Sequence, residues 1–281
     1  MKKLRLTIVL PLVLGPLAGS GLCLAADELP ARAASEPLVT DRPDFTESPE
    51  TVPRGRVQLE SGVTFTYDHE PPSQSSSYAA PELLFRVGIV DAFELRIGWE
   101  GYTWLQERLP EQSQSGRTVY RDQWSQGASD LYLGVKWKML EQAGLRPHLS
   151  VIPAITVPSG TIGFGSRDVD PEVKLAWSYD LSESMALSGN INAVVPSDDE
   201  GHFFQAGASV SLGIGLTDDV GCYLEYFGFY PNTRETDCAH SVNAGLTWQI
   251  TEDFQLDWRA GFGLNEEADD FFTGAGFGIR F

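Results

Sequence analysis

The side chains of this 281-residue chain that could do chemistry begin with His148 and Ser150. Residues two apart on a β-strand share a face, so this imidazole and hydroxyl could meet as base and nucleophile. They suggest an outer-membrane lipid hydrolase as the third of three possible functions. The strand pattern described below opposes it, because it directs both side chains to a barrel interior, and no Asn or Asp stands close in sequence to orient the base. We therefore predict that the chain is not an enzyme and has no catalytic residues.

Metal-binding chemistry has weaker support. The four histidines are scattered, and Cys238 with His240 provides too few ligands for zinc. Acidic side chains in two predicted outer loops, residues 196–202 and 265–270, could hold Ca²⁺ or Mg²⁺, although solvated loop acids are the simpler interpretation. We predict no metal site and no cofactor.

The charge of the chain argues against nucleic acid as a partner. It has 20 basic and 39 acidic residues, a net charge of −19 at pH 7. DNA and RNA are polyanions whose binding requires a basic surface. A strongly acidic chain is expected instead to have solvated acidic loops or surfaces that meet cations.

The chain opens with two segments that do not belong to the main fold. Residues 1–26 have a basic start, an apolar run and a small-residue end, which is typical of a cleaved secretory signal peptide. Residues 27–55 form a proline-rich and acidic lead without any regular period. Prolines interrupt the hydrogen bonds of a β-ladder, so we do not expect a spanning strand here. We expect this lead either on the periplasmic side of the barrel or inserted into the mouth of the barrel, where it would act like a plug.

Beyond the lead, residues 56–281 alternate apolar and polar side chains in twelve segments. Each has about 8–12 residues, close to the ~9–11 that cross a bilayer as a tilted strand. Connections alternate between short turns and long loops, the longest predicted loop being residues 105–126. The pattern predicts an all-β fold, a transmembrane antiparallel up-and-down β-barrel of about twelve strands. Five of the seven tryptophans fall on the apolar parity, as an interfacial girdle would place them: Trp99, Trp137, Trp177, Trp248 and Trp258.

The last eleven residues, FFTGAGFGIRF, predict the strand that closes the barrel against the first strand. One parity is apolar and ends on Phe281, which we predict to be the signal recognised by the barrel-assembly machinery. The other parity holds three glycines. With two glycines of other strands they leave space inside the barrel, where we expect the lead: Gly62, Gly261, Gly274, Gly276 and Gly278.

Charged residues on the inward parity are the candidates for the lining of the lumen. Both signs occur, so most are expected to form cross-strand pairs, and a subset to set solute preference. A barrel of twelve strands lies between a filled interior and an open channel, which predicts a narrow or partly plugged pore. Either the lead or the predicted long loop of residues 105–126 could be the plug. The candidate lining residues are Arg86, Arg96, Glu100, Lys136, Glu172, Lys174, Glu225, Asp257, Arg259 and Arg280.

The two cysteines beyond the signal peptide are predicted to stay unbridged. Cys222 is expected near the periplasmic rim and Cys238 at the outer end of the strands. A separation of ~25 Å along a strand is far beyond the reach of a disulfide.

Several motifs carry a resemblance to a known family. They are TDRPDFTES at residues 40–48, VPRG at 52–55, QLESG at 58–62, GASDL at 127–131 and the final GFGIRF. Together they resemble the outer-membrane transporter family grouped under the meta-pathway phenol-degradation name. The resemblance implies a barrel in the bacterial cell outer membrane for passage of aromatic or other small hydrophobic compounds, and it implies no catalytic residues.

The favoured function is passive passage of small solutes, with aromatic or hydrophobic compounds as candidates. The alternative is a non-conducting structural or surface-interaction barrel whose interior ion pairs close the lumen. Expected partners are outer-membrane lipid, the barrel-assembly machinery and a small-molecule solute.

Overall fold

The structure is a computed structural model that describes residues 37–113, 115 and 117–281. The predicted signal peptide and the start of the predicted lead lie outside the described residues. In the described part of the chain no helix is long and apolar enough to cross a membrane. The strands are β1 (Val57–Asp68), β2 (Gln74–Val90), β3 (Phe93–Trp99), β4 (Tyr102–Gln112), β5 (Thr118–Ala128), β6 (Leu131–Leu140), β7 (His148–Val157), β8 (Asp170–Ser182), β9 (Met185–Val194), β10 (Ser197–Asp198), β11 (Gly201–His202), β12 (Gln205–Gly215), β13 (Val220–Tyr230), β14 (Ala239–Thr251), β15 (Phe254–Gly263) and β16 (Phe271–Arg280).

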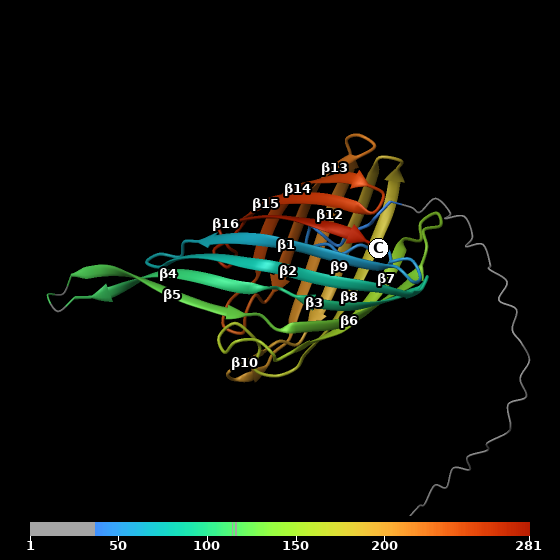
Figure 1. Cartoon of the computed structure of the whole chain (residues 1–281). Helices are drawn as coiled ribbons and strands as arrows, with labels where there is room; N and C mark the ends of the chain where they lie inside the picture. The colour runs from blue at the N-terminus through green and yellow to red at the C-terminus, as the bar shows by residue number, and fades with distance from the viewer. Residues whose placement is uncertain (1–36, 114, 116) are drawn as a thin grey trace, which may run out of the picture. The chain divides into compact units, whose positions relative to one another are not determined.

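Twelve of these strands close into an antiparallel barrel, which confirms the predicted fold (Figure 1). Around the barrel they follow the order β1, β2, β3, β6, β7, β8, β9, β12, β13, β14, β15, β16, and β1 pairs with both β2 and β16. Each strand therefore lies beside the barrel strand that precedes it in the chain, as in an up-and-down barrel. The short strands β10 and β11 form a separate hairpin in an outer loop.

The barrel is apolar outside and polar inside. On its outer face Leu224 and Ile191 are each 59% exposed. In its interior Arg86 is 1% exposed and Lys136 is fully buried. Successive residues of a strand point to opposite faces, so one parity meets hydrocarbon and the other meets the interior.

The prediction of a loop at residues 105–126 is wrong, because β4 and β5 form a β-hairpin there. The register of the pair Trp99 and Leu131 continues unchanged to Tyr102 and Ala128, so two long strands run from the barrel into this hairpin. Figure 1 shows the hairpin projecting away from the barrel. Both of its faces carry polar and charged side chains. The alternation that marks the other strands is therefore weak here, and the continued ladder of backbone hydrogen bonds maintains the strands.

Both cysteines of the described chain are free thiols, as predicted. Cys222 lies near the start of β13, and Cys238 directly precedes β14. The two strands are antiparallel neighbours, so these positions fall toward opposite ends of the hairpin.

The C-terminal strand closes the barrel as predicted. β16 pairs with β1 from Arg280 opposite Gln58 to Phe271 opposite Tyr67. The side chain of Phe281 is 65% exposed. Its role as an assembly signal stays a prediction.

Deleting Phe281 should reduce the amount of folded barrel in the outer membrane. The residue completes the seam, since its amide donates to the Val57 carbonyl at 2.8 Å and its carbonyl accepts from the Val57 amide at 3.3 Å. Heat-modifiable migration of the membrane fraction measures folding, and Phe281→Tyr is the control that keeps an aromatic end. Full insertion of the shortened chain would contradict the assembly role.

Candidate functional site

Residues 38–53 run through the interior of the barrel, and we call them the inserted lead. The amide of Leu38 donates to the Glu252 carbonyl at 2.8 Å at the periplasmic rim, and the amide of Gly55 donates to the Gly88 carbonyl at 2.8 Å where the chain enters β1. Between these points Thr46 is only 3% exposed. Of the two positions expected for the lead, the structure shows the inserted one.

Glycines make room for this insertion, partly as predicted. Gly62 and Gly276 stand opposite each other in β1 and β16, and a Cβ on either would collide with the Arg42 guanidinium. A Cβ on Gly278 would collide with the Thr40 side chain. The expectation was wrong for the other two glycines: the nearest atoms to Gly274 belong to the barrel wall, and Gly261 makes room for Phe272.

Asp41 anchors the lead in a buried cluster of charges. Its carboxylate lies 2.6 Å from Arg96, 3.0 Å from Lys136 and 3.2 Å from Arg86. Two wall carboxylates complete the cluster, since Arg86 also pairs with Glu60 at 3.0 Å and with Glu94 at 2.8 Å. The side chains of these residues are at most 3% exposed, so every charge in the cluster is met by an opposite charge away from bulk water.

Glu47 of the lead bridges two further cations of the wall. It lies 2.8 Å from Arg96 and 2.7 Å from Lys174. In the opposite direction, Glu225 of the wall accepts the backbone amides of Phe45 and Thr46 at 2.8 and 2.7 Å. A carboxylate of the lead therefore binds cations of the wall, and a carboxylate of the wall binds amides of the lead.

Arg42 lies against the β1–β16 seam and pairs with carboxylates of the strands on either side of it. Its guanidinium pairs with Glu82 of β2 at 2.5 Å and with Asp257 of β15 at 3.3 Å. Arg259 of β15 donates to the Pro43 carbonyl at 2.9 Å. This part of the lead is thus held from both sides of the β1–β16 seam.

The predicted lining residues fall into three groups. Glu100 and Glu172 face open space in the lumen, and Glu172 pairs with Lys174 at 3.4 Å. Arg280 lies at the periplasmic rim, where it pairs with Asp253 at 2.8 Å. The remaining seven contact the inserted lead: Arg86, Arg96, Lys136, Lys174, Glu225, Asp257 and Arg259.

His148 and Ser150 are not arranged as a base and a nucleophile. The Ser150 hydroxyl donates to the Pro49 carbonyl of the lead. The two ring nitrogens of His148 lie 3.6 Å from Glu50 and 3.5 Å from Asp180. The serine is thus occupied by the lead.

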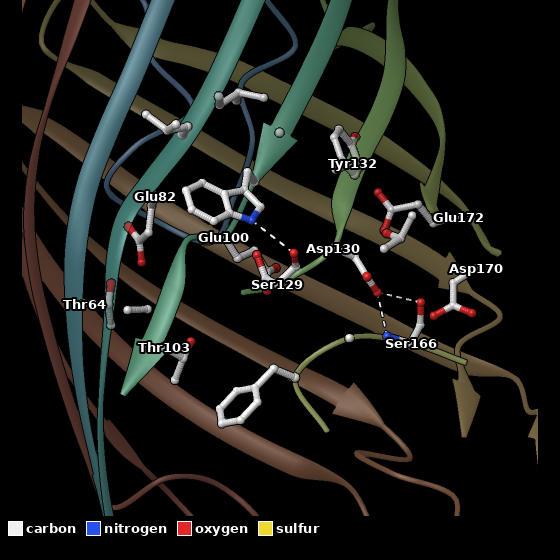
Figure 2. A pocket seen from close by; sticks show the side chains of 18 of the residues that line it. Thr64, Glu82, Glu100, Thr103, Ser129, Asp130, Tyr132, Ser166, Asp170 and Glu172 are labelled. Carbon is white, nitrogen blue, oxygen red and sulfur yellow. Dashed lines mark hydrogen bonds between the residues drawn. The ribbon is translucent and has the colours of Figure 1, made fainter. Parts of the chain in front are cut away.

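Beyond the lead, toward the outside, lies a cavity of about 880 Å³ that we call the outer cavity. Figure 2 shows Glu82 and Glu100 on one side of it, and Asp170 and Glu172 on the other. Arg42, Glu47 and Arg96 line it where it meets the lead. The outer cavity is therefore an acidic chamber whose floor is the inserted lead.

The loop of residues 158–168 folds over this cavity and is held by Asp130. One carboxylate oxygen accepts the amides of Ser159 at 2.8 Å and Gly160 at 2.6 Å. The other accepts the amide and hydroxyl of Ser166 at 2.6 and 2.7 Å (Figure 2). Burial alone would raise the pKa of Asp130, but these hydrogen bonds lower it below its usual range. Asp130 thus stays ionised and fixes the loop.

Two smaller cavities flank the lead. One of about 260 Å³ is lined by four phenylalanines, and Phe45 of the lead stacks on Phe227 with ring centroids 4.8 Å apart. The other, the inner cavity of about 330 Å³, lies between the lead and strands β9, β12, β13 and β14. The sequence reasoning missed the phenylalanines, although strand parity alone turns three of them inward: Phe227, Phe229 and Phe272.

No three histidine, cysteine or acidic side chains among the residues that the structure describes are grouped so that they could hold a metal ion.

Titration of the lead carboxylates follows from these contacts. Burial would raise the pKa of Asp41, but Arg86, Lys136 and Arg96 lower it well below its usual range. Burial would also raise the pKa of Glu47, but Arg96 and Lys174 outweigh this effect and lower the pKa to about 2. Asp44 differs, because burial and the nearby Glu225 both raise its pKa.

Asp41→Asn should loosen the inserted lead by about 3 kcal/mol, because removing one partner leaves buried charges unmatched. Hydrogen exchange of residues 38–53 measures the change. Glu50→Gln is the matched control: that side chain is 36% exposed and pairs with Lys138 at 3.2 Å, so its loss should cost less than about 1 kcal/mol. Equal effects of the two variants would contradict the buried cluster as the anchor.

The inserted lead should be most stable at an intermediate pH and less stable at lower and at higher pH. Asp41 and Glu47 have lowered pKa values when inserted, so their contribution is complete above the pKa of the free carboxyl and is lost as pH falls toward about 2. Asp44 has a raised pKa, so its contribution is present at low pH and is lost as pH rises through that value. Protection factors of residues 38–53 should pass through a maximum, and Asp44→Asn should abolish only the decline on the high-pH side of that maximum.

Known proteins share this architecture. A family model described as "Putative MetA-pathway of phenol degradation" matches residues 40–281. No curated protein matches the chain. An outer membrane channel from Pseudomonas putida F1 is similar with a TM-score of 0.60 and 16% identity, over 83% of this chain and 97% of that one.

Two autotransporter domains are more distant in fold. The transport unit of AIDA-I from Escherichia coli has a TM-score of 0.48 and 8% identity, over 80% of this chain and 89% of that one. The translocator domain of NalP from Neisseria meningitidis has a TM-score of 0.47 and 10% identity, over 80% and 88%.

The fold and the family model agree on what kind of protein this is. A closed barrel with an apolar outer face and a polar interior is a protein of the bacterial outer membrane. The family model begins at Thr40, so it includes most of the inserted lead as well as every strand of the barrel. The chain belongs to the family described as "Putative MetA-pathway of phenol degradation".

Proposed function

We propose that this barrel lets small solutes cross the outer membrane passively, with the inserted lead as its constriction. The observation that carries the proposal is the position of Arg42. This one side chain lines both the outer cavity of about 880 Å³ and the inner cavity of about 330 Å³. A solute that enters from outside therefore meets Arg42 before it reaches the periplasmic side.

The contacts of Arg42 suit a constriction that yields. The guanidinium is held by two carboxylates, Glu82 and Asp257, and not by apolar packing. Water inside a lumen replaces such polar contacts at a small net cost, because each partner remains hydrogen-bonded. The description of the P. putida F1 protein as an outer membrane channel supports passage as the shared activity.

Aromatic or hydrophobic compounds are the solute class that we favour. The cavity of about 260 Å³ beside the lead has aromatic walls, and it shares Thr64 and Arg259 with the outer cavity. Phe45 contacts Phe227 at 4.8 Å and Phe229 at 5.3 Å between ring centroids, so a further ring could stack there. The family description, which refers to phenol degradation, points to the same class.

Two other functions have less support. A non-conducting structural barrel is favoured by the many ion pairs between the lead and the wall. Lipid hydrolysis would need Ser150 free to attack, whereas its hydroxyl is bonded to the Pro49 carbonyl. We infer that the protein is a solute-conducting barrel and not an enzyme. We also propose outer-membrane lipid and the barrel-assembly machinery as its other partners.

Arg42→Ala should connect the two cavities and raise single-channel conductance several-fold in planar bilayers. Arg54→Ala is the matched control, because Arg54 is an exposed arginine directly after the inserted lead. Heat-modifiable migration verifies that both variants fold. If neither the wild type nor Arg42→Ala gives conductance steps at any voltage, the structural barrel is the better description.

A further inference from the structure

Three carboxylates stand side by side across the strands that form one wall of the outer cavity. The register pairs Leu83 with Trp99 and Trp99 with Leu131. Because the same register resumes in β4 and β5, Glu100 lies opposite both Glu82 and Asp130. Like charges on directly opposed residues destabilise a sheet, so this row has a cost that folding alone does not explain.

The carboxylates at the two ends of the row have partners, whereas the one at its centre has none within the described residues. Glu82 pairs with Arg42 at 2.5 Å, and Asp130 accepts four hydrogen bonds from the 158–168 loop. Glu100 makes no hydrogen bond or ion pair with any residue that the structure describes, although it lines the outer cavity. Its charge is therefore directed at the contents of the cavity.

The opposite wall has acceptors that lack donors. Asp170 is 8% exposed, and one of its carboxylate oxygens has no hydrogen-bond partner in the described chain; this oxygen lies 3.9 Å from Nε2 of His202. The hydroxyls of Ser129 and Tyr132 are buried in the same condition. All three side chains line the outer cavity. Buried acceptors without donors indicate a missing partner.

The charges of the cavity define what that partner is. Its lining has seven acidic and four basic side chains, an excess of three negative charges. Three of the cations are already engaged, since Lys174 and Arg96 pair with Glu47 and Arg42 pairs with Glu82. The field inside the cavity thus attracts cations and repels anions.

We propose that the outer cavity binds an organic ammonium ion. An ammonium group has three donors and no acceptor, which matches the carboxylate of Glu100, unpaired in the described chain, and Asp170 on the opposite wall adds negative charge to the same cavity. Trp99 and Phe164 also line the cavity and offer apolar faces to the body of the ligand. A metal ion fits less well, because its oxygen ligands must lie within about 2.0–2.6 Å of one point, whereas these carboxylates occupy separate walls (Figure 2).

This proposal rests on the proposed function only for the fate of the ligand, since binding does not require passage. The test is equilibrium dialysis of the purified full-length protein in a non-ionic detergent, with benzylammonium as the probe and benzyl alcohol as its neutral counterpart. The wild type should bind benzylammonium more tightly than benzyl alcohol. Glu100→Gln should weaken benzylammonium binding about tenfold through the loss of a charge-assisted contact, and leave benzyl alcohol unchanged.

Glu235→Gln is the matched control, because it removes the same charge from an exposed position in an outer loop. Asp170→Asn tests the opposite wall and should act in the same direction as Glu100→Gln. Equal affinity for the two probes, or benzylammonium binding that neither cavity variant weakens, would overturn the proposal. A wild type that binds benzylammonium but shows no conductance would refute the passage and leave the binding site intact.

Discussion

The structure depends on the contact between Asp41 and three buried cations. The barrel wall brings Arg86, Arg96 and Lys136 together with only two carboxylates, Glu60 and Glu94. A surplus positive charge in a buried cluster is costly, because desolvation of an unmatched ion amounts to several kcal/mol. Asp41 supplies the missing negative charge. The empty barrel is thus electrostatically incomplete, and the lead completes it.

This balance also shapes the space that remains. Glu47 follows Asp41 closely in the lead and draws Arg96 and Lys174 toward it, so these cations are engaged at the floor of the outer cavity. The acids above them, Glu100 and Asp170, are left facing the cavity. A plug that neutralises the cations of the wall therefore makes the chamber above it acidic. The proposed constriction and the proposed preference for cations therefore depend on one set of contacts.

Strand parity explains how much of this the sequence predicted. Alternation alone gave the twelve strands, the closing pair of β1 and β16, and the space left by Gly62 and Gly276, because each depends only on which face a residue occupies. The β4–β5 hairpin escaped prediction because both of its faces are polar. The partners of Asp41 could not be predicted either, since the lead has no period and its position depends on charges from strands far apart in the chain.

Two of the motifs that carry the family resemblance meet at the same cavity. In the motif at residues 40–48, Arg42 and Glu47 form the floor of the outer cavity. In the motif at residues 127–131, Gly127 leaves room for Phe164 and Asp130 holds the loop above it. Neither motif contains a nucleophile placed beside a base. What the resemblance identifies is thus the construction of a chamber with a charged floor and a fixed roof, and selection of a solute by such a chamber needs no catalytic group.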